Sequence, residues 1–124
     1  MNHQRPVNLD LTTIHFPVTA IISIMHRLSG IAVFILLPFM LYVLQQSLQS
    51  QESFNMLQSF LHYAWVRLLV WIFASALFFH FMAGVRHMIA DFGYGEEIAT
   101  GRKTASVLLV LTVISTIVLG VWIW

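Results

Sequence analysis

Cysteine is absent from this sequence of 124 residues, and the absence excludes several kinds of chemistry. Without a thiol the chain forms no disulfide, holds no iron–sulfur cluster and offers no cysteine nucleophile. Its six histidines are the remaining ligands for a transition metal. The sequence also lacks a phosphate-binding glycine loop, an HExxH sequence and the elbow of a serine hydrolase. We therefore expect any reaction to depend on a cofactor and on partner subunits.

Charge is scarce as well. Only 9% of the residues are charged and 59% are hydrophobic, against about 25% and about 45–50% in soluble domains. Six basic and five acidic side chains cannot cover the surface of a soluble protein. The net charge of +1 comes with no basic stripe, so the sequence predicts a lipid environment and no nucleic-acid partner.

Three long runs carry no formal charge, and they lie at residues 28–51, 68–85 and 104–124. A helix of eighteen residues reaches roughly 27 Å, which is close to the thickness of the hydrocarbon layer. We predict an all-α membrane protein in which residues 1–124 form a single membrane-anchor domain. Its transmembrane helices are expected at about 20–47, 62–90 and 104–124, after an N-terminal segment at 1–19. That segment has no compact apolar stretch of the signal-peptide kind, so the first helix should be retained.

The distribution of basic residues predicts the orientation. One side of the membrane would hold Arg5, Arg27, Arg86, Arg102 and Lys103, and the other side only Arg67. Because Lys and Arg concentrate on the cytoplasmic side, the N terminus is expected there and the C terminus on the opposite face. The connection at 48–60 is polar and expected to be partly helical, and Pro38 is expected to bend the first helix.

Polar side chains in the second predicted helix form one stripe. The spacing i, i+4, i+7 and i+11 places four residues within an arc of roughly 60°: His80, Gly84, His87 and Asp91. His80 would lie near the middle of the membrane, where a polar group needs a partner. One interpretation is an imidazole bonded to a carbonyl or hydroxyl of a neighbouring helix. The other is an axial ligand of haem iron, with Gly84 leaving room for a flat macrocycle.

A low-spin haem b needs two axial ligands, and no second histidine of this chain is expected at the depth of His80, since His26 and His87 would lie near one interface and His62 near the other. If His80 binds iron, another chain must supply the opposite ligand.

A second stripe lies near the start of the first predicted helix. Four residues there are spaced at i, i+3, i+4 and i+7 and so share one face: Ser23, His26, Arg27 and Gly30. One interpretation is an arginine that fixes topology beside a histidine, with Gly30 allowing close helix packing. The other is a polar pocket at the membrane edge for a haem propionate or a quinone carbonyl.

Two sets of residues resemble known signatures. Arg5-Pro6-Val7, Leu11, Val18, Ser23, His26-Arg27, Ser29 and Gly30 resemble the N-terminal signature of the cytochrome b membrane-anchor subunit of succinate dehydrogenase. The set His80, Gly84, Arg86-His87 and Asp91 resembles that family's second signature. The likeness covers the whole chain and is greatest to bacterial members, in the RPVNLDL opening and the DFGY run. Ala90 departs from it, where a bulkier residue is expected before the aspartate.

The resemblance implies the larger of two small anchors in a complex of four subunits, respiratory complex II of the bacterial inner membrane. In that complex a flavoprotein with FAD oxidises succinate, and an iron–sulfur subunit carries electrons to ubiquinone. The anchors share one haem b, and each forms half of the helical bundle that binds it. The C terminus would then be periplasmic, and the RPVNLDL segment would dock on the iron–sulfur subunit.

The resemblance also implies roles for single residues. His80 would be the axial haem ligand on this chain, and the second anchor would supply the other. Ser23 and Arg27 would bind the quinone. The haem would be bordered by His26, Arg27, Gly30, Gly84 and His87. No residue of this chain is expected to be catalytic by itself.

Two alternatives stay open at this point. The chain could anchor a complex of the fumarate-reductase type or one that uses menaquinone. It could also be a haem-free scaffold whose histidines only pack.

Overall fold

The computed structural model describes residues 16–95 and 97–124. These ranges contain four helices and no strand: α1 (Val18–Gln49), α2 (Gln51–Phe60), α3 (Ala64–Asp91) and α4 (Ile98–Ile123). The all-α membrane fold predicted from the sequence is confirmed. The RPVNLDL segment, with Arg5 and Pro6, lies outside the described residues, so its expected docking on an iron–sulfur subunit stays a prediction.

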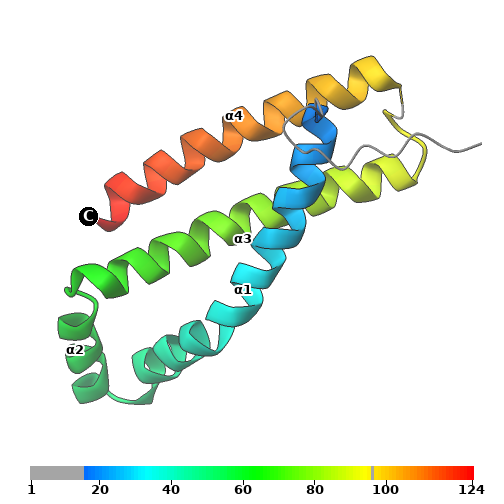
Figure 1. Cartoon of the computed structure of the whole chain (residues 1–124). Coiled ribbons are helices and arrows are strands. Elements are labelled where there is room, and N and C mark those ends of the chain that lie inside the picture. The colour runs from blue at the N-terminus through cyan, green and yellow to red at the C-terminus, as the bar shows by residue number, and fades with distance from the viewer. Residues whose placement is uncertain (1–15, 96) are drawn as a thin grey trace, which may run out of the picture.

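The three long helices α1, α3 and α4 are each long and apolar enough to cross a membrane. They run in alternating directions, and α3 packs against both of the others (Figure 1). The beginnings of α1 and α4 therefore lie at the same end of the bundle as the last turns of α3. The C terminus lies at the opposite end. The two polar stripes of the sequence, one early in α1 and one late in α3, are thereby brought together.

Local chemistry explains where the helices begin and end. α4 begins at Ile98, ahead of the residue 104 at which a span was expected, so Arg102 and Lys103 lie in its first turns. Arg and Lys side chains are favourable at the level of the lipid headgroups. They do not interrupt a helix, so α4 can begin before its membrane-spanning part. α1 continues through Pro38, and it changes direction along its course in Figure 1.

The polar connection at 48–60 forms the short helix α2. Ser50 caps it by accepting a hydrogen bond from the Ser53 backbone N–H at 3.1 Å. The Ser53 hydroxyl is buried and donates to the backbone carbonyl of Gln46 at 2.8 Å and to its side-chain oxygen at 2.6 Å. These bonds hold α2 against the end of α1, which confirms the expectation of partial helix in this connection.

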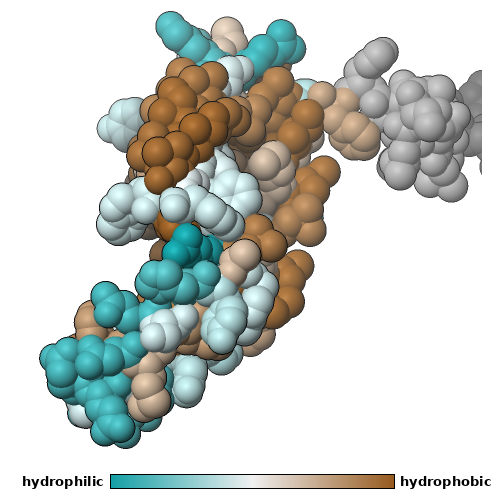
Figure 2. All heavy atoms as spheres, turned by 90° about the vertical axis from the view of Figure 1, so that its left-hand side faces the viewer, coloured by the Kyte–Doolittle hydropathy of each residue, from teal (hydrophilic) through white to brown (hydrophobic). Residues whose placement is uncertain are grey.

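The core is small for a chain of this length. It consists of five buried residues from the three long helices, near the end where α1 and α4 begin: Ile22, Phe79, Ala83, Ala105 and Leu108. Most other apolar side chains are exposed, among them Phe34 at 78% and Trp122 at 83%. In Figure 2 hydrophobic side chains form large patches on this face, whereas hydrophilic ones gather at the upper edge and at the lower end over α2. Such a surface suits lipid or a membrane partner and does not suit water.

Far from the core, one hydrogen bond joins α3 to the last turns of α4. The Trp71 indole Nε1 donates to the backbone carbonyl of Thr116 at 2.9 Å. Gly120 makes room for the indole, because a Cβ there would lie 3.3 Å from Nε1. This bond ties together two helix ends that the core does not reach.

We predict that Trp71→Phe lowers the free energy of unfolding by about 1 kcal/mol, because hydrogen bonds between membrane helices contribute on that order. Denaturant unfolding of the purified complex in mild detergent would measure the change. Trp122→Phe is the matched control, since its side chain is exposed and forms no hydrogen bond within the described ranges. Equal changes for the two variants would show that the Trp71 bond contributes nothing.

Candidate functional site

The candidate site lies where the His80 ring of α3 meets the backbone of α1. His80 Nδ1 is 3.1 Å from the backbone carbonyl oxygen of His26 and 3.2 Å from the Ser29 hydroxyl. The Ser29 hydroxyl donates to the same carbonyl at 2.8 Å. A carbonyl oxygen can only accept, so His80 Nδ1 must carry the proton.

This bond determines the state of the other ring nitrogen. In a neutral imidazole with a proton on Nδ1, Nε2 carries the free lone pair. His80 Nε2 forms no hydrogen bond with any residue in the described part of the chain. A backbone carbonyl that accepts from one ring nitrogen is the usual arrangement behind a histidine that binds metal through the other. His80 is thus both partnered by a neighbouring helix and free to ligate.

Three imidazoles gather here, and we refer to His26, His80 and His87 as the histidine cluster. The His26 and His80 rings stack with centroids 4.3 Å apart and planes 20° apart. His87 meets His26 edge-on, with centroids 5.8 Å apart. The spacing i and i+7 on α3 had placed His80 and His87 on one stripe, and the fold adds His26 between them from α1. The expectation that no second histidine lies at the depth of His80 is therefore wrong, because the His26 ring stacks directly on the His80 ring.

One ring nitrogen of His26, Nε2, has no hydrogen-bond partner among the described residues. This nitrogen is buried. Gly84 lies beside it, since a Cβ on Gly84 would be 3.5 Å from that nitrogen. A buried polar atom without a partner carries a free-energy cost. A ligand that places a polar group at this point would remove the cost.

Gly30 is required by the position of the His80 ring. A Cβ at Gly30 would lie 2.9 Å from His80 Cε1 and 3.3 Å from Nδ1, closer than carbon atoms approach without displacement. A Cβ at Gly84 would make only an ordinary contact at 3.5 Å. The two glycines therefore differ: Gly30 admits the ring itself, whereas Gly84 leaves space beside the cluster.

Ser23 lies one turn before Arg27 on α1, and Arg27 directly follows His26. Ser23 is half-buried and lines a small cavity together with Ala83 and His87. Arg27 is exposed and forms no hydrogen bond or ion pair with any described residue. The guanidinium thus stands outside the histidine cluster and is open to a ligand or to another chain.

Two features of the site were not foreseen from the sequence. Ser29 was part of the quoted signature but had no expected role. Its position three residues after His26 in a helix could have indicated that its hydroxyl reaches the His26 backbone carbonyl. The second feature is the carbonyl itself. Because it belongs to the backbone, no residue type in the sequence could have indicated its role.

Asp91, the last residue of the stripe predicted on the second helix, ends α3. It is exposed and forms no hydrogen bond or ion pair in the described ranges.

The cluster cannot hold a free metal ion by itself. Within the described residues no three His, Asp or Glu side chains come together as a set of metal ligands. What α3 offers is a single imidazole nitrogen. That donor suits a metal whose other ligands come from a cofactor and from a second protein chain.

Comparison with known proteins identifies the family. Residues 1–119 match the family described as "Succinate dehydrogenase/Fumarate reductase transmembrane subunit". A succinate dehydrogenase cytochrome b556 subunit of Coxiella burnetii is 48% identical over 125 residues, which cover 100% of both chains. The cytochrome b556 subunit of Paracoccus denitrificans is 31% identical over 126 residues, 95% of this chain and 94% of the relative. The cytochrome b560 subunit of Reclinomonas americana is 29% identical over 95% of this chain and 85% of its own.

These matches cover both signatures of the sequence and the three helices that can cross a membrane. The chain therefore belongs to the family of succinate dehydrogenase and fumarate reductase transmembrane subunits, as a cytochrome b membrane anchor and a non-catalytic subunit of respiratory complex II.

Proposed function

We propose that this chain binds one haem b jointly with a second small anchor subunit, and that His80 Nε2 is its axial ligand to the iron. The observation that carries the proposal is the bond from His80 Nδ1–H to the His26 carbonyl. It fixes the tautomer whose Nε2 can ligate iron. The relatives' names support the same reading, because they describe cytochromes b.

The residues present fit a haem. The macrocycle supplies the equatorial ligands, so the protein needs to supply only axial nitrogens, and this chain offers one. Gly84 leaves space beside the cluster, and the unpaired His26 Nε2 and exposed Arg27 could donate to the polar edge of the cofactor. We propose that His26, Arg27, Gly30, Gly84 and His87 border it. When bound, haem supplies a one-electron redox centre within the membrane.

We further propose that Ser23 and Arg27 form this chain's part of the ubiquinone site. Reduction puts negative charge on the quinone carbonyl oxygens, and a guanidinium stabilises that charge electrostatically. Arg27 cannot donate the proton, because its guanidinium stays charged at neutral pH. The Ser23 hydroxyl can hydrogen-bond a carbonyl oxygen and pass a proton towards it. Ser23 and Arg27 are one turn apart on α1, so they can approach the same ligand.

The partner subunits would hold the remaining chemistry. We propose that a flavoprotein with FAD oxidises succinate and that an iron–sulfur subunit delivers electrons to the quinone. The chain would anchor both at the bacterial inner membrane, with its N terminus cytoplasmic and its C terminus periplasmic. The side predicted to be cytoplasmic carries Arg27, Arg86, Arg102 and Lys103, and Arg67 lies on the other.

A haem-free anchor is the second candidate function. It is favoured by the stacking of His80 on His26, which would serve packing even without a cofactor. The experiments below separate the two.

We expect His80→Leu to lose or shift the b-type α band in a dithionite-reduced minus oxidised spectrum of the purified complex. The reason is that leucine has no lone pair for iron. His62→Leu is the matched control, since the His62 side chain is exposed near α2 and bonds, among the described residues, only the backbone carbonyl of Gln58. A wild-type complex without haem would favour the haem-free anchor. A band unchanged in His80→Leu would show instead that haem is bound without His80 as its ligand.

Gly30→Ala should also weaken or shift that band, because its methyl group would displace the His80 ring. Gly101→Ala is the comparison, since a Cβ there meets nothing closer than 3.7 Å. The haem content per complex is the quantity to measure. If Gly30→Ala and Gly101→Ala retain equal haem, the position of the His80 ring does not govern ligation.

For Arg27→Leu we predict a fall of roughly tenfold or more in succinate-driven ubiquinone reduction, in the range seen when a charge-stabilising donor is removed. Reduction of a soluble dye by the flavoprotein should be unchanged. Haem content should fall less than in His80→Leu, and Arg67→Leu serves as the control at the other end of the bundle. Equal haem loss in Arg27→Leu and His80→Leu would argue against separate roles.

A further inference from the structure

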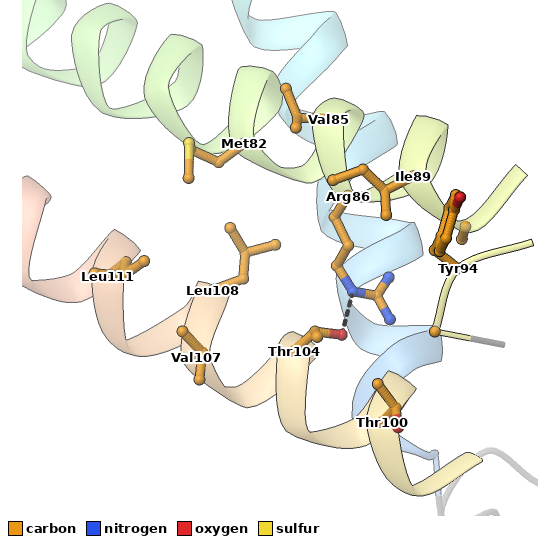
Figure 3. A pocket seen from close by; sticks show the side chains of 12 residues that line it. Met82, Val85, Arg86, Ile89, Tyr94, Thr100, Thr104, Val107, Leu108 and Leu111 are labelled. Atoms are coloured by element: carbon orange, nitrogen blue, oxygen red, sulfur yellow. Dashed lines mark hydrogen bonds between the residues drawn. The ribbon is translucent and has the colours of Figure 1, made fainter. Parts of the chain in front are cut away.

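An apolar groove of about 420 Å³ runs between α3 and α4, away from the histidine cluster. Its walls are the side chains of Met82 and Ile89 on one helix and of Val107 and Leu111 on the other. Figure 3 shows Met82 of α3 and Leu108 of α4 pointing into the space between the two helices. Arg86 is the single charged residue among those that line it.

The groove lies on the opposite face of α3 from the proposed haem site. At about 100° per residue, Met82, Arg86 and Ile89 are centred roughly half a turn away from His80 and His87. None of the groove residues has a part in haem or quinone binding as proposed above. The groove therefore calls for an occupant of its own.

Arg86 lines the half of the groove nearer the α3–α4 loop, where Tyr94 and Thr100 also line it. Its Nε donates to the Thr104 hydroxyl at 3.2 Å, and one Nη donates to the Gly101 carbonyl at 3.0 Å, as Figure 3 shows for Thr104. A guanidinium has five N–H donors, so three of them are unused within the described residues. A cation in a membrane helix is stabilised only when such donors meet an acceptor or an anion.

The charges around Arg86 favour an anion. A second cavity adjoins the groove and shares Arg86, and it is also lined by His87, Arg102 and Glu97. No carboxylate in the described ranges lies within ion-pair distance of Arg86. The guanidinium thus keeps a positive charge that no described neighbour neutralises.

The dimensions of the groove match one leaflet of a bilayer. From Thr100 to Leu111 the α4 wall is about 16 Å long, which is roughly half the hydrocarbon thickness. Arg86 lies five residues before the end of α3 at Asp91, about 8 Å along the axis and close to the depth of the headgroups. A ligand that fits is anionic at one end and a flexible hydrocarbon over the rest.

We propose that this groove is a binding site for an anionic phospholipid of the leaflet on the side of the α3–α4 loop. Arg86 binds the phosphate, and one acyl chain lies between α3 and α4 along Met82, Val107 and Leu111. Basic pockets between membrane helices are known to select anionic headgroups in this way. The lipid would complete the packing of α4, whose contact with the bundle at this end includes only two buried residues, Ala105 and Leu108.

The test uses the whole complex in lipid nanodiscs that contain a trace of phosphatidylglycerol with a photoactivatable diazirine in its acyl chain. After illumination, mass spectrometry of the digested chain locates the labelled peptides. A parallel sample carries phosphatidylcholine with the same acyl chain. We expect residues 104–111 to be labelled at least threefold more by phosphatidylglycerol, because only its net negative charge complements Arg86.

Two matched pairs of variants test the two halves of the site. Arg86→Gln removes the charge, and Arg67→Gln is its control at the opposite end of the bundle. Val107→Trp fills the groove without changing its charge, and Val110→Trp is its control, since Val110 is exposed and does not line the groove. We expect labelling to fall at least fivefold in Arg86→Gln and in Val107→Trp, and to stay unchanged in both controls.

Four results would overturn the proposal. Equal labelling by the two lipids would mean that the groove is merely solvated by the bilayer. Absence of labelling from both lipids would mean that a protein partner covers it. Labelling displaced by excess ubiquinone would assign the groove to a quinone. Labelling that survives Arg86→Gln or Val107→Trp would overturn it as well. Val107→Trp leaves the Arg86 guanidinium in place. Its labelling therefore tests whether the lipid occupies the groove even if the complex does not assemble with Arg86→Gln.

Discussion

The hydrogen bond from His80 Nδ1 to the backbone carbonyl of His26 is the constraint on which the site depends. It joins α1 to α3 near the middle of the bundle, and it selects the tautomer whose Nε2 is free. It also brings the His80 ring so close to α1 that residue 30 has to be glycine. Ser29 donates to the same carbonyl and so strengthens the arrangement. A single backbone oxygen thus links helix packing, side-chain orientation and ligand chemistry.

Helix α3 carries polar groups on two opposite faces, and each face meets a different neighbour. On the α1 side the histidine cluster leaves one buried nitrogen of His26 without a partner among residues 16–95 and 97–124. On the α4 side Arg86 has two hydrogen bonds and unused donors. In a chain with 9% charged residues, polar groups at these depths need partners that the described part of the chain does not supply. We propose a shared cofactor for the first face and an anionic lipid for the second.

The sequence predicted the fold well because membrane thickness and uncharged length are directly related. It also predicted that His80 and His87 share a face, since helical spacing is local. It could not predict the stacking of His26 on His80, the need for glycine at position 30, or the role of Ser29. These depend on the register between α1 and α3, which no local pattern specifies. α4 begins at Ile98, ahead of the membrane span expected from residue 104, because a helix can continue beyond the hydrocarbon layer through Arg102 and Lys103. The periodicity of the sequence also could not predict the groove between α3 and α4, because a groove depends on how two helices pack.

Chemical rescue of a ligand-deletion variant tests the central claim most directly, namely that His80 Nε2 binds haem iron. His80→Gly removes the side chain and leaves a space of imidazole size, so added imidazole can occupy it. We predict that the purified variant complex lacks the b-type α band and regains it as imidazole is added, in a saturable manner. A variant that keeps the full band without imidazole would contradict the account, because the iron would then be held by ligands other than His80.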